Sequence, residues 1–280
     1  MAFANAFNGD TVSLNYILQT LDRKSIIIPG ITANPNLTVS AAGEVAYFYE
    51  RGSSNIGTGS VGAQLTYVST GGTKVSITLD KAIQIKDVLP LVNSATVSAD
   101  IIGDRAIYNS ILAANKQNEL AVAYLISSAT AFDTSNSAAA SFIASSGTAY
   151  QIITEAQKVF KVLNKATAMK PTAVIVSSGT YALLLNSTQF IRSTLSGDDV
   201  VYEGVVGKIA GLNVVEAVDL TVDFIILNAE GFAAPTNINS FVLADGTAAG
   251  YPNGTIIAGE LGYGFYAKTG LIYSYSGTLS

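Results

Sequence analysis

The side chains that most enzymes use for catalysis are missing from this sequence. It contains no histidine and no cysteine, which removes the commonest general base, the thiol nucleophile and every Ser-His-Asp triad. Disulfides and thiolate metal sites are excluded as well. Any remaining chemistry would have to use serine, lysine and carboxylate side chains. We therefore expect a protein that is not an enzyme and uses no cofactor.

One glycine-rich segment has the spacing of a dinucleotide-binding loop. Residues 57–62 read GTGSVG, a literal G-x-G-x-x-G. A dinucleotide site needs a strand before this loop and a helix after it, whose N-terminus holds the pyrophosphate. The residues that follow, 63–68, are strand-like. We therefore interpret 57–62 as the tip of a ribbon and not as a cofactor site.

Acidic pairs at two places raise the question of a metal site. Asp198 and Asp199 are adjacent, and Asp219 and Asp223 are four residues apart. Neither pair has the ligand number or the turn glycine of a calcium loop. We expect no metal site and interpret these residues as carboxylates of loops and strand ends.

A row of lysines offers another kind of interaction, the pairing of charges between surfaces. Lys158, Lys161 and Lys165 share one face of a predicted helix, and the segment that follows is rich in acid. The ordinary interpretation, which we favour, is a solvated helix face. The alternative is pairing between copies of the chain in a ring. The acids available for it are Asp198, Asp199, Glu203, Glu216, Asp219 and Asp223.

The composition predicts a large core beneath a weakly charged surface. The 280 residues allow one large domain or two modest ones. Hydrophobic residues make up 49%, whereas charged residues make up only 12%, about half the usual share. A surface rich in Ser, Thr and Asn would account for this, and so would burial against further copies of the chain.

Charge and hydropathy argue against nucleic-acid, secreted and membrane-spanning classes. The formal net charge is −5, whereas proteins that grip phosphate backbones usually carry a basic face. The first ten residues, MAFANAFNGD, show no basic region and no apolar run, so we expect no secretory signal. No apolar run reaches about 18 residues, so no membrane span is expected.

The elements that must position these residues begin with an arm and a ribbon. Residues 1–43 are irregular, with a short strand over 25–28, and we interpret them as an arm outside the core. Alternating patterns over 45–50, 63–68 and 74–79, with a turn at Gly71 and Gly72, predict a long antiparallel ribbon. A lone ribbon is marginal in water, so its own domain or a neighbouring subunit must cover it.

Two helices follow a strand-like stretch over 81–97. The first is predicted over 101–127, capped by Ser98 or Asp100. Its apolar stripe consists of Ile107, Ile111, Leu112, Val122, Leu125 and Ile126. The second is predicted over 148–165, where Thr148 and Gln151 form a capping-box pair. Residues 130–146, between the helices, are expected to form a loop.

The segment 171–217 has a distinctive order of elements. A strand over 172–176 is followed by Ser178 as an N-cap and by a helix over 181–185 or 181–191. A polar loop then leads to a strand over 212–217, which the glycines at 204, 207 and 211 precede. Further strands are predicted downstream, at 224–227, 241–243, 255–258 and along the aromatic-rich stretch 261–274.

This order resembles a segment of the major capsid proteins of tailed bacteriophages, the Hong Kong 97-like fold. The order of elements along the whole chain is similar as well. The resemblance implies an α+β fold with an N-terminal arm (1–43), an extended β-hairpin E-loop (44–79) and an axial domain (148–257). The peripheral domain would combine 80–147, including a spine helix at 100–128, with 258–280.

The resemblance also implies a function. The chain would be a major capsid protein that self-assembles as pentamers and hexamers into an icosahedral shell around double-stranded DNA. It would be made in the host cytoplasm and reside in the virion. It would enclose DNA without sequence-specific binding, and meet a portal and separate scaffolding or decoration proteins, but no membrane. Expected contacts between subunits are Glu50, Arg51, Lys74, Lys158, Lys161, Asp198, Asp199 and Glu203.

Three other function classes stay open at this point. An encapsulin-like cellular nanocompartment shares the fold. A secreted surface-layer or adhesin protein would suit the low charge and abundant Ser, Thr and Asn, but the missing signal argues against it. An enzyme using serine, lysine and carboxylates is the least favoured.

Overall fold

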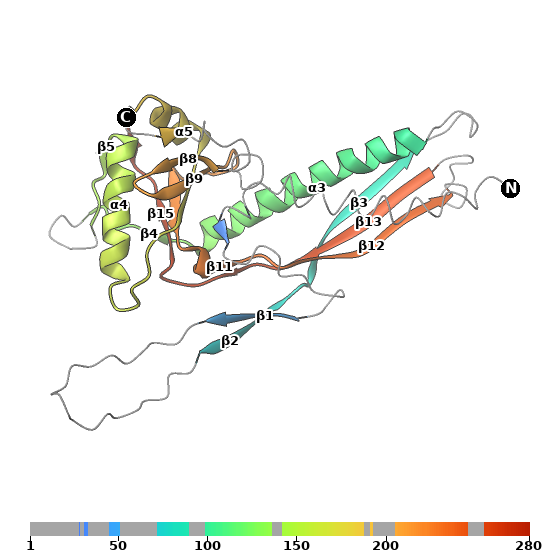
Figure 1. The fold of residues 1–280 in the computed structure, drawn as a ribbon, viewed down its shortest axis with the longest axis horizontal. Coiled ribbons are helices and arrows are strands. Elements are labelled where there is room, and N and C mark those ends of the chain that lie inside the picture. The colour runs from blue at the N-terminus through green and yellow to red at the C-terminus, as the bar shows by residue number, and fades with distance from the viewer. Residues whose placement is uncertain are drawn as a thin grey trace, which may run out of the picture.

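The computed structural model describes residues 28, 31–32, 45–50, 72–89, 99–135, 142–187, 191–192, 205–245 and 255–280. Figure 1 shows three parts: a compact α/β body at one end, a long helix that extends from it beside three strands, and a two-stranded ribbon below. The helices that the structure describes over their full length are α3 (Ala99–Ser128), α4 (Ala149–Leu163), α5 (Ser178–Leu185) and the short 3-10 helix η1 (Ala229–Gly231).

A seven-stranded mixed sheet forms the centre of the compact body. Its strands are, in spatial order, β4 (Thr130–Ala131), β15 (Ile272–Tyr275), β10 (Phe224–Leu227), β6 (Ala173–Val176), β9 (Leu212–Glu216), β8 (Val205–Ile209) and β7 (Ile191–Arg192). The pairs β4–β15 and β6–β9 are parallel and the others antiparallel. Every residue of β6 and β10 is buried, as their unbroken apolar sequences AVIV and FIIL require.

Helices cover both faces of this sheet, which makes a three-layer sandwich. Alternate residues of a strand point to opposite faces, so Val174 packs in the core that contains Phe160 of α4 and Leu184 of α5. Its neighbour Ile175 packs on the other face, with Leu125 of α3. The sheet therefore separates two apolar cores, one under α4 and α5 and the other under the C-terminal part of α3.

Local capping explains where the body's helices begin and end. The Thr148 hydroxyl accepts a hydrogen bond from the Gln151 backbone N–H at 3.3 Å and starts α4. Ser177 starts α5 in the same way, accepting from the Thr180 N–H at 3.2 Å. Asn164 ends α4, and its side-chain amide donates to the Gly270 carbonyl at 3.0 Å. This last bond ties the end of the helix to the chain just before β15.

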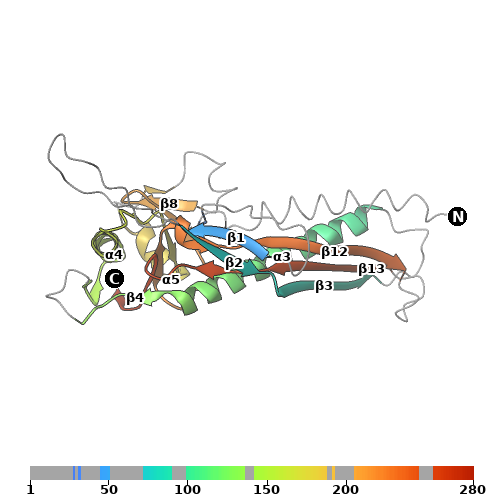
Figure 2. The ribbon, with the colours of Figure 1, turned by 90° about the horizontal axis from the view of Figure 1, so that it is seen from below.

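The elongated part consists of the N-terminal half of α3 and a separate three-stranded sheet. Its strands are β12 (Thr236–Asp245), β13 (Thr255–Tyr263) and β3 (Lys81–Leu89), antiparallel in that order. Figure 2 shows them running side by side along the helix. Ala113 and Ala114 of α3 pack against Leu261, with Ile83 and Ile85 beside them. These small side chains let the helix lie close to the sheet.

The ribbon is an antiparallel pair of strands, β1 (Val45–Glu50) and β2 (Thr73–Thr78), with Val45 opposite Thr78 and Glu50 opposite Thr73. Two small sheets complete the fold. They pair β11 (Phe232–Ala233) with β14 (Tyr266–Ala267), and β5 (Ser146–Gly147) in parallel with β16 (Thr278–Leu279). The expected antiparallel ribbon is thus confirmed at its base.

Several predicted elements are confirmed with small shifts in their bounds. Both helices, the strands over 172–176, 212–217 and 224–227, and the Thr148 cap are present. The stretch 130–146 was expected to be a loop, but its ends form β4 and β5, because the C-terminal strands β15 and β16 pair with them. The strand expected at 241–243 extends over all of β12.

Of the two caps expected for α3, Asp100 is ruled out, because the helix begins at Ala99, directly after Ser98. Three expectations about single residues are wrong. Ser177, not Ser178, caps α5. Leu112, expected in the apolar stripe of α3, is exposed. Ile28, expected at the end of a strand in an external arm, is helical and buried, and the Thr32 N–H donates to its carbonyl at 3.1 Å. Apolar burial against α3 and the sheet outweighs the local strand propensity there.

Several other expectations fall outside the described residues. These are most of the arm (1–27, 29–30 and 33–43), the part of the expected ribbon over 51–71 with its tip and the strand at 63–68, residues 90–97 and the polar loop at 193–203.

The sheets group the chain differently from the expected domain ranges. Within 148–257, β12 pairs with the strands beside α3 and not with the compact body. Within 258–280, β15 belongs to the seven-stranded sheet of that body.

Candidate assembly surfaces

The ribbon presents one face to the body and the other to solvent. Ala46 and Ile77, opposite each other on β1 and β2, are buried against Ala233 of β11. On the outer face the Tyr47 side chain is 57% exposed, and Lys74 Nζ lies 3.5 Å from the centroid of its ring. This cation–π pair holds an aromatic surface and a positive charge together on the outside of the ribbon. Such a face suits contact with another polypeptide.

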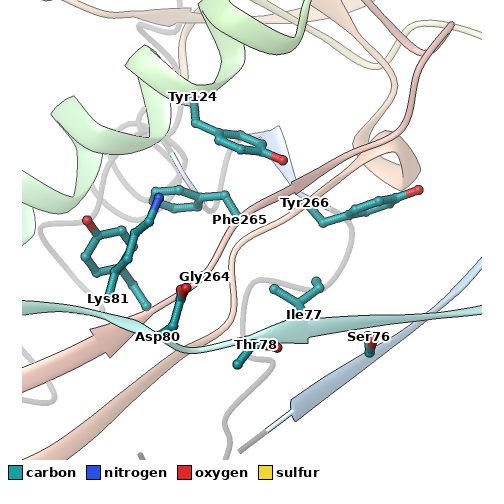
Figure 3. A pocket seen from close by; sticks show the side chains of 10 residues that line it. Ser76, Ile77, Thr78, Asp80, Lys81, Tyr124, Gly264, Phe265 and Tyr266 are labelled. Atoms are coloured by element: carbon teal, nitrogen blue, oxygen red, sulfur yellow. The ribbon is translucent and has the colours of Figure 1, made fainter. Parts of the chain in front are cut away.

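A cleft of about 220 Å³ lies where the ribbon joins the body. Figure 3 shows its aromatic lining, Tyr124 of α3 with Phe265 and Tyr266, next to Ile77 of the ribbon. The Tyr124 and Phe265 rings are 5.6 Å apart between centroids. Gly264 sits at the closest approach of the two parts: a Cβ there would lie 2.9 Å from both the Ile77 Cγ2 atom and the Thr78 carbonyl oxygen. The ribbon can therefore lie this close to the body only if residue 264 is glycine.

An ion pair joins the elongated sheet to α3. The Arg105 guanidinium donates to Asp87 of β3, and the Asn109 amide donates to the same carboxylate at 3.3 Å. The hydrogen bond from Arg105 is the main cause that lowers the pKa of Asp87. Tyr108 and Leu112, on the same half of the helix, are exposed. This surface combines apolar groups with charges that are already paired.

The outer face of α4 and the turn after it carry lysines without an ion pair. Lys158 and Lys161 of α4 and Lys165 of the turn are exposed, and none of them forms an ion pair with another described residue. At the same end of the helix, Val162 is 49% and Leu163 is 43% exposed. We call these five residues the lysine ridge.

A shallow groove of about 600 Å³ runs between α3 and the turn after β9. Its lining is Glu119, Ala123 and Ile126 of α3 and residues 218–221. Val218 is 80% exposed, the largest exposure among the large hydrophobic residues that the structure describes. The charged members are Glu119, whose nearest described cation is Lys116 at 2.5 Å, and the exposed Asp219. We call this lining the acidic groove.

The acidic side chains in the described part of the chain do not gather into a metal centre. No group of three or more acidic side chains close enough to hold a metal occurs there. Asp223 accepts a hydrogen bond from the Gly277 N–H at 2.7 Å, and Glu216 accepts from the Ser178 hydroxyl at 2.7 Å, so both carboxylates fix local structure. Burial raises the pKa values of Tyr273 and Tyr275 above the ordinary value of tyrosine. No described helix is long and apolar enough to cross a membrane.

The structure describes only some of the predicted contact residues. Lys74, Lys158 and Lys161 are exposed, as an interface requires. Glu50 ends β1, but its side chain lies outside the description, as do Arg51, Asp198, Asp199 and Glu203 altogether. The predictions from sequence did not include the exposed apolar residues of these surfaces. Strand and helix patterns do not indicate that the tertiary fold leaves Tyr47, Val162, Leu163 and Val218 exposed.

Comparison with solved structures identifies the architecture. A structure of Mycobacterium phage Che8 matches with a TM-score of 0.52 and 18% identity, covering 87% of this chain and 90% of the other. The capsid structure of the cyanophage P-SCSP1u matches with a TM-score of 0.52 and 14% identity, over 88% and 87%. A virus-like particle from Pyrococcus furiosus matches with a TM-score of 0.50 and 10% identity, over 93% and 96%.

These likenesses establish the fold alone, because the identities are low. The chain has the Hong Kong 97-like fold of shell proteins, and the match extends over most of its length. No known family model matches the sequence, and no curated protein is detectably similar to it.

Proposed function

We propose that this chain is the major capsid protein of a tailed phage, which self-assembles into an icosahedral shell around double-stranded DNA. The observation that carries the proposal is the extent of the structural likeness. It covers 88% of this chain and 87% of the phage capsid chain, with a TM-score of 0.52. The exposed apolar side chains on the ribbon, α3 and α4 support it, because a free monomer gains nothing from them.

The parts of the molecule receive roles in this proposal. The β1–β2 ribbon is the base of the E-loop, α3 is the spine helix, and the three-stranded sheet with α3 forms the peripheral domain. The three-layer sandwich is the axial domain. The boundaries follow the sheets, so β12 joins the peripheral domain and β15 the axial domain. Residues 1–43 remain the N-terminal arm, with Ile28 and Ile31 as its fixed point on the body.

The proposed partners are mainly further copies of the chain. Pentamers and hexamers would share many weak contacts, whose number makes the shell stable. A portal and separate scaffolding or decoration proteins would join the shell in the host cytoplasm, and the product would be the virion capsid. The net charge of −5 is compatible with packed DNA, since a strongly basic wall would hold DNA immobile. Glu50, Arg51, Lys74, Lys158, Lys161, Asp198, Asp199 and Glu203 stay proposed contacts.

A cellular nanocompartment shell, similar to an encapsulin, is the second candidate function. The observation that favours it is the match to the virus-like particle from Pyrococcus furiosus, which covers 96% of that chain. Both candidates need the same fold and the same kind of subunit contacts. They differ in what the shell encloses.

Electron microscopy of the purified protein tests the proposal. We expect uniform closed shells in negative stain, and a protein that stays monomeric under all conditions would contradict both candidates. Nuclease-protected DNA of genome length inside shells from infected cells would support the phage capsid. Shells that enclose a protein cargo and no genome would favour the nanocompartment.

A further inference from the structure

The lysine ridge and the acidic groove lie on opposite sides of the sandwich. The ridge is on the outer face of α4, whose inner face packs on one side of the seven-stranded sheet. The groove is formed by α3, which packs on the other side of the same sheet. Figure 1 shows α4, the strands and α3 in this order across the compact body. Two surfaces so placed cannot meet within one chain.

The two surfaces are complementary in shape and polarity. The ridge is convex, because Lys158, Lys161 and Val162 follow the i, i+3, i+4 spacing of one face of α4 and Lys165 lies in the turn directly after the helix. The exposed apolar side chains of Val162 and Leu163 lie beside this positive charge, at the C-terminal end of the helix. The groove is concave, with Ala123, Ile126 and Val218 exposing apolar atoms next to the carboxylates of Glu119 and Asp219. Apolar centres with opposite charges around them are typical of specific protein contacts.

We propose that the lysine ridge of one copy docks in the acidic groove of the next copy, a head-to-tail contact that closes into a ring. A contact between different surfaces of identical chains generates a ring when the rotation closes. The inference rests on the proposed shell function and names the partner surface, Glu119 and Asp219, that the ridge meets.

A second copy fits the ridge better than nucleic acid does. Phosphate backbones attract cations but do not bury exposed apolar side chains such as Val162 and Leu163. The chain has 20 acidic and 15 basic residues, so each copy offers an excess of carboxylates to the lysines of another. The acidic groove has both carboxylates and an apolar lining that could cover Val162 and Leu163.

A charge exchange between the two surfaces tests the contact. The ridge variant is Lys158→Glu with Lys161→Glu, the groove variant is Glu119→Lys with Asp219→Lys, and the exchanged variant carries all of these substitutions. The fraction of shell-sized material is measured by sedimentation and negative-stain microscopy, with circular dichroism to confirm folding. Lys170→Glu with Lys208→Glu, at exposed lysines outside the ridge, is the control with the same change of charge.

We expect the ridge variant and the groove variant each to lower the shell fraction about tenfold or more, since like charges then face each other and a tenfold change needs only about 1.4 kcal/mol. The exchanged variant should recover most of the wild-type fraction, and the control should stay within about twofold of it. Because exposed charge pairs are screened, the loss should be smaller at about 1 M salt.

Three results would overturn the contact. The first is an exchanged variant that assembles no better than the ridge and groove variants. The second is wild-type assembly by the ridge and groove variants. The third is a ridge variant that forms normal shells but loses encapsulated nucleic acid, which would make DNA the partner of the ridge. Wild-type protein that forms no shells at all would instead contradict the proposed function itself, and this contact with it.

Discussion

At the scale of single residues, one buried hydroxyl stands out. Thr32 is only 7% exposed, and its Oγ1 forms no hydrogen bond with any described residue. A buried polar group without a partner costs roughly 1–3 kcal/mol. Replacing Thr32 by valine keeps the shape and removes the hydroxyl. We therefore expect Thr32→Val to raise the free energy of unfolding by about 1 kcal/mol, measured by urea denaturation.

The matched control for this prediction is Thr180→Val. The Thr180 hydroxyl donates to the Asp223 carbonyl at 2.9 Å and accepts from Ser177 at 3.0 Å. The same substitution should here lower the free energy of unfolding by about 1–2 kcal/mol. Equal effects at the two sites would show that the Thr32 hydroxyl has a partner, and would contradict the account.

Acid sensitivity should arise at Asp87. The hydrogen bond from Arg105 lowers the pKa of Asp87 in the folded state. The ionised carboxylate therefore contributes fully to the free energy of unfolding above its unfolded pKa of about 4. This contribution is lost as the pH falls through the lower pKa of the folded state. Asp87→Asn should therefore cost about 0.5–1 kcal/mol at pH 7, and the difference from wild type should shrink below pH 4. The measurement is denaturation at a series of pH values.

Asp80 supplies the comparison for this pH series. It is exposed, and no described residue pairs with it. Asp80→Asn should leave stability unchanged within about 0.3 kcal/mol at every pH. A wild-type minus Asp87→Asn difference that stays constant down to pH 2 would rule out the ion pair as the cause.

At the scale of elements, the ribbon's orientation depends on Gly264. A methyl group there would meet the Thr78 carbonyl oxygen and Ile77 at 2.9 Å, closer than side-chain carbons normally approach. We expect Gly264→Ala to lower the free energy of local unfolding of the ribbon by about 1–3 kcal/mol. Amide hydrogen exchange in β2 should become faster. The sandwich strands β6 and β10 should keep their protection.

Gly179→Ala is the matched glycine control. Gly179 lies in α5, and its added Cβ would meet only the Ser177 Oγ, at an ordinary 3.9 Å. Alanine at a helical position should stabilise by roughly 0.5–1 kcal/mol and leave β2 exchange unchanged. Unaltered exchange in β2 after Gly264→Ala would mean that the ribbon is seated by other contacts.

Elements with strong local signals could be predicted from the sequence, whereas long-range pairings could not. The apolar runs at 173–176 and 224–227 and the cap at Thr148 are local, and each reappears in the structure. That β15 lies between β10 and β4 depends on contacts across the whole chain. Ile28 looks like the end of a strand in an arm, yet burial in the core beneath α3 decides its conformation. The exposure of apolar residues such as Val218 is equally a product of the tertiary fold.

At the scale of the whole molecule, α3 links two parts with separate cores. Its N-terminal half packs on the three-stranded sheet through Ala113 and Ala114, and its C-terminal half packs on the sandwich through Val122 and Leu125. The first core is small and the second large, so the two parts differ in how much apolar burial holds them. In the proposed shell, such a division would let the two parts of a subunit shift relative to each other between pentamers and hexamers.

Breaking α3 between the two cores tests whether it transmits position from one part to the other. Lys116 is exposed and lies between Ala114 and Val122 along the helix. Proline there removes a backbone hydrogen bond and kinks the helix at a cost of about 3 kcal/mol or more. We expect Lys116→Pro to abolish shell assembly and to lower hydrogen-exchange protection in β3 and β13, while β6 and β10 stay protected.

Lys116→Ala is the control for this prediction. It removes only the surface pair with Glu119 and should assemble normally. If Lys116→Pro lowers protection equally in both parts, the molecule is a single cooperative unit. If it assembles normally, then the connections from β11 to β12 and from β13 to β14 are enough to hold the two parts in position.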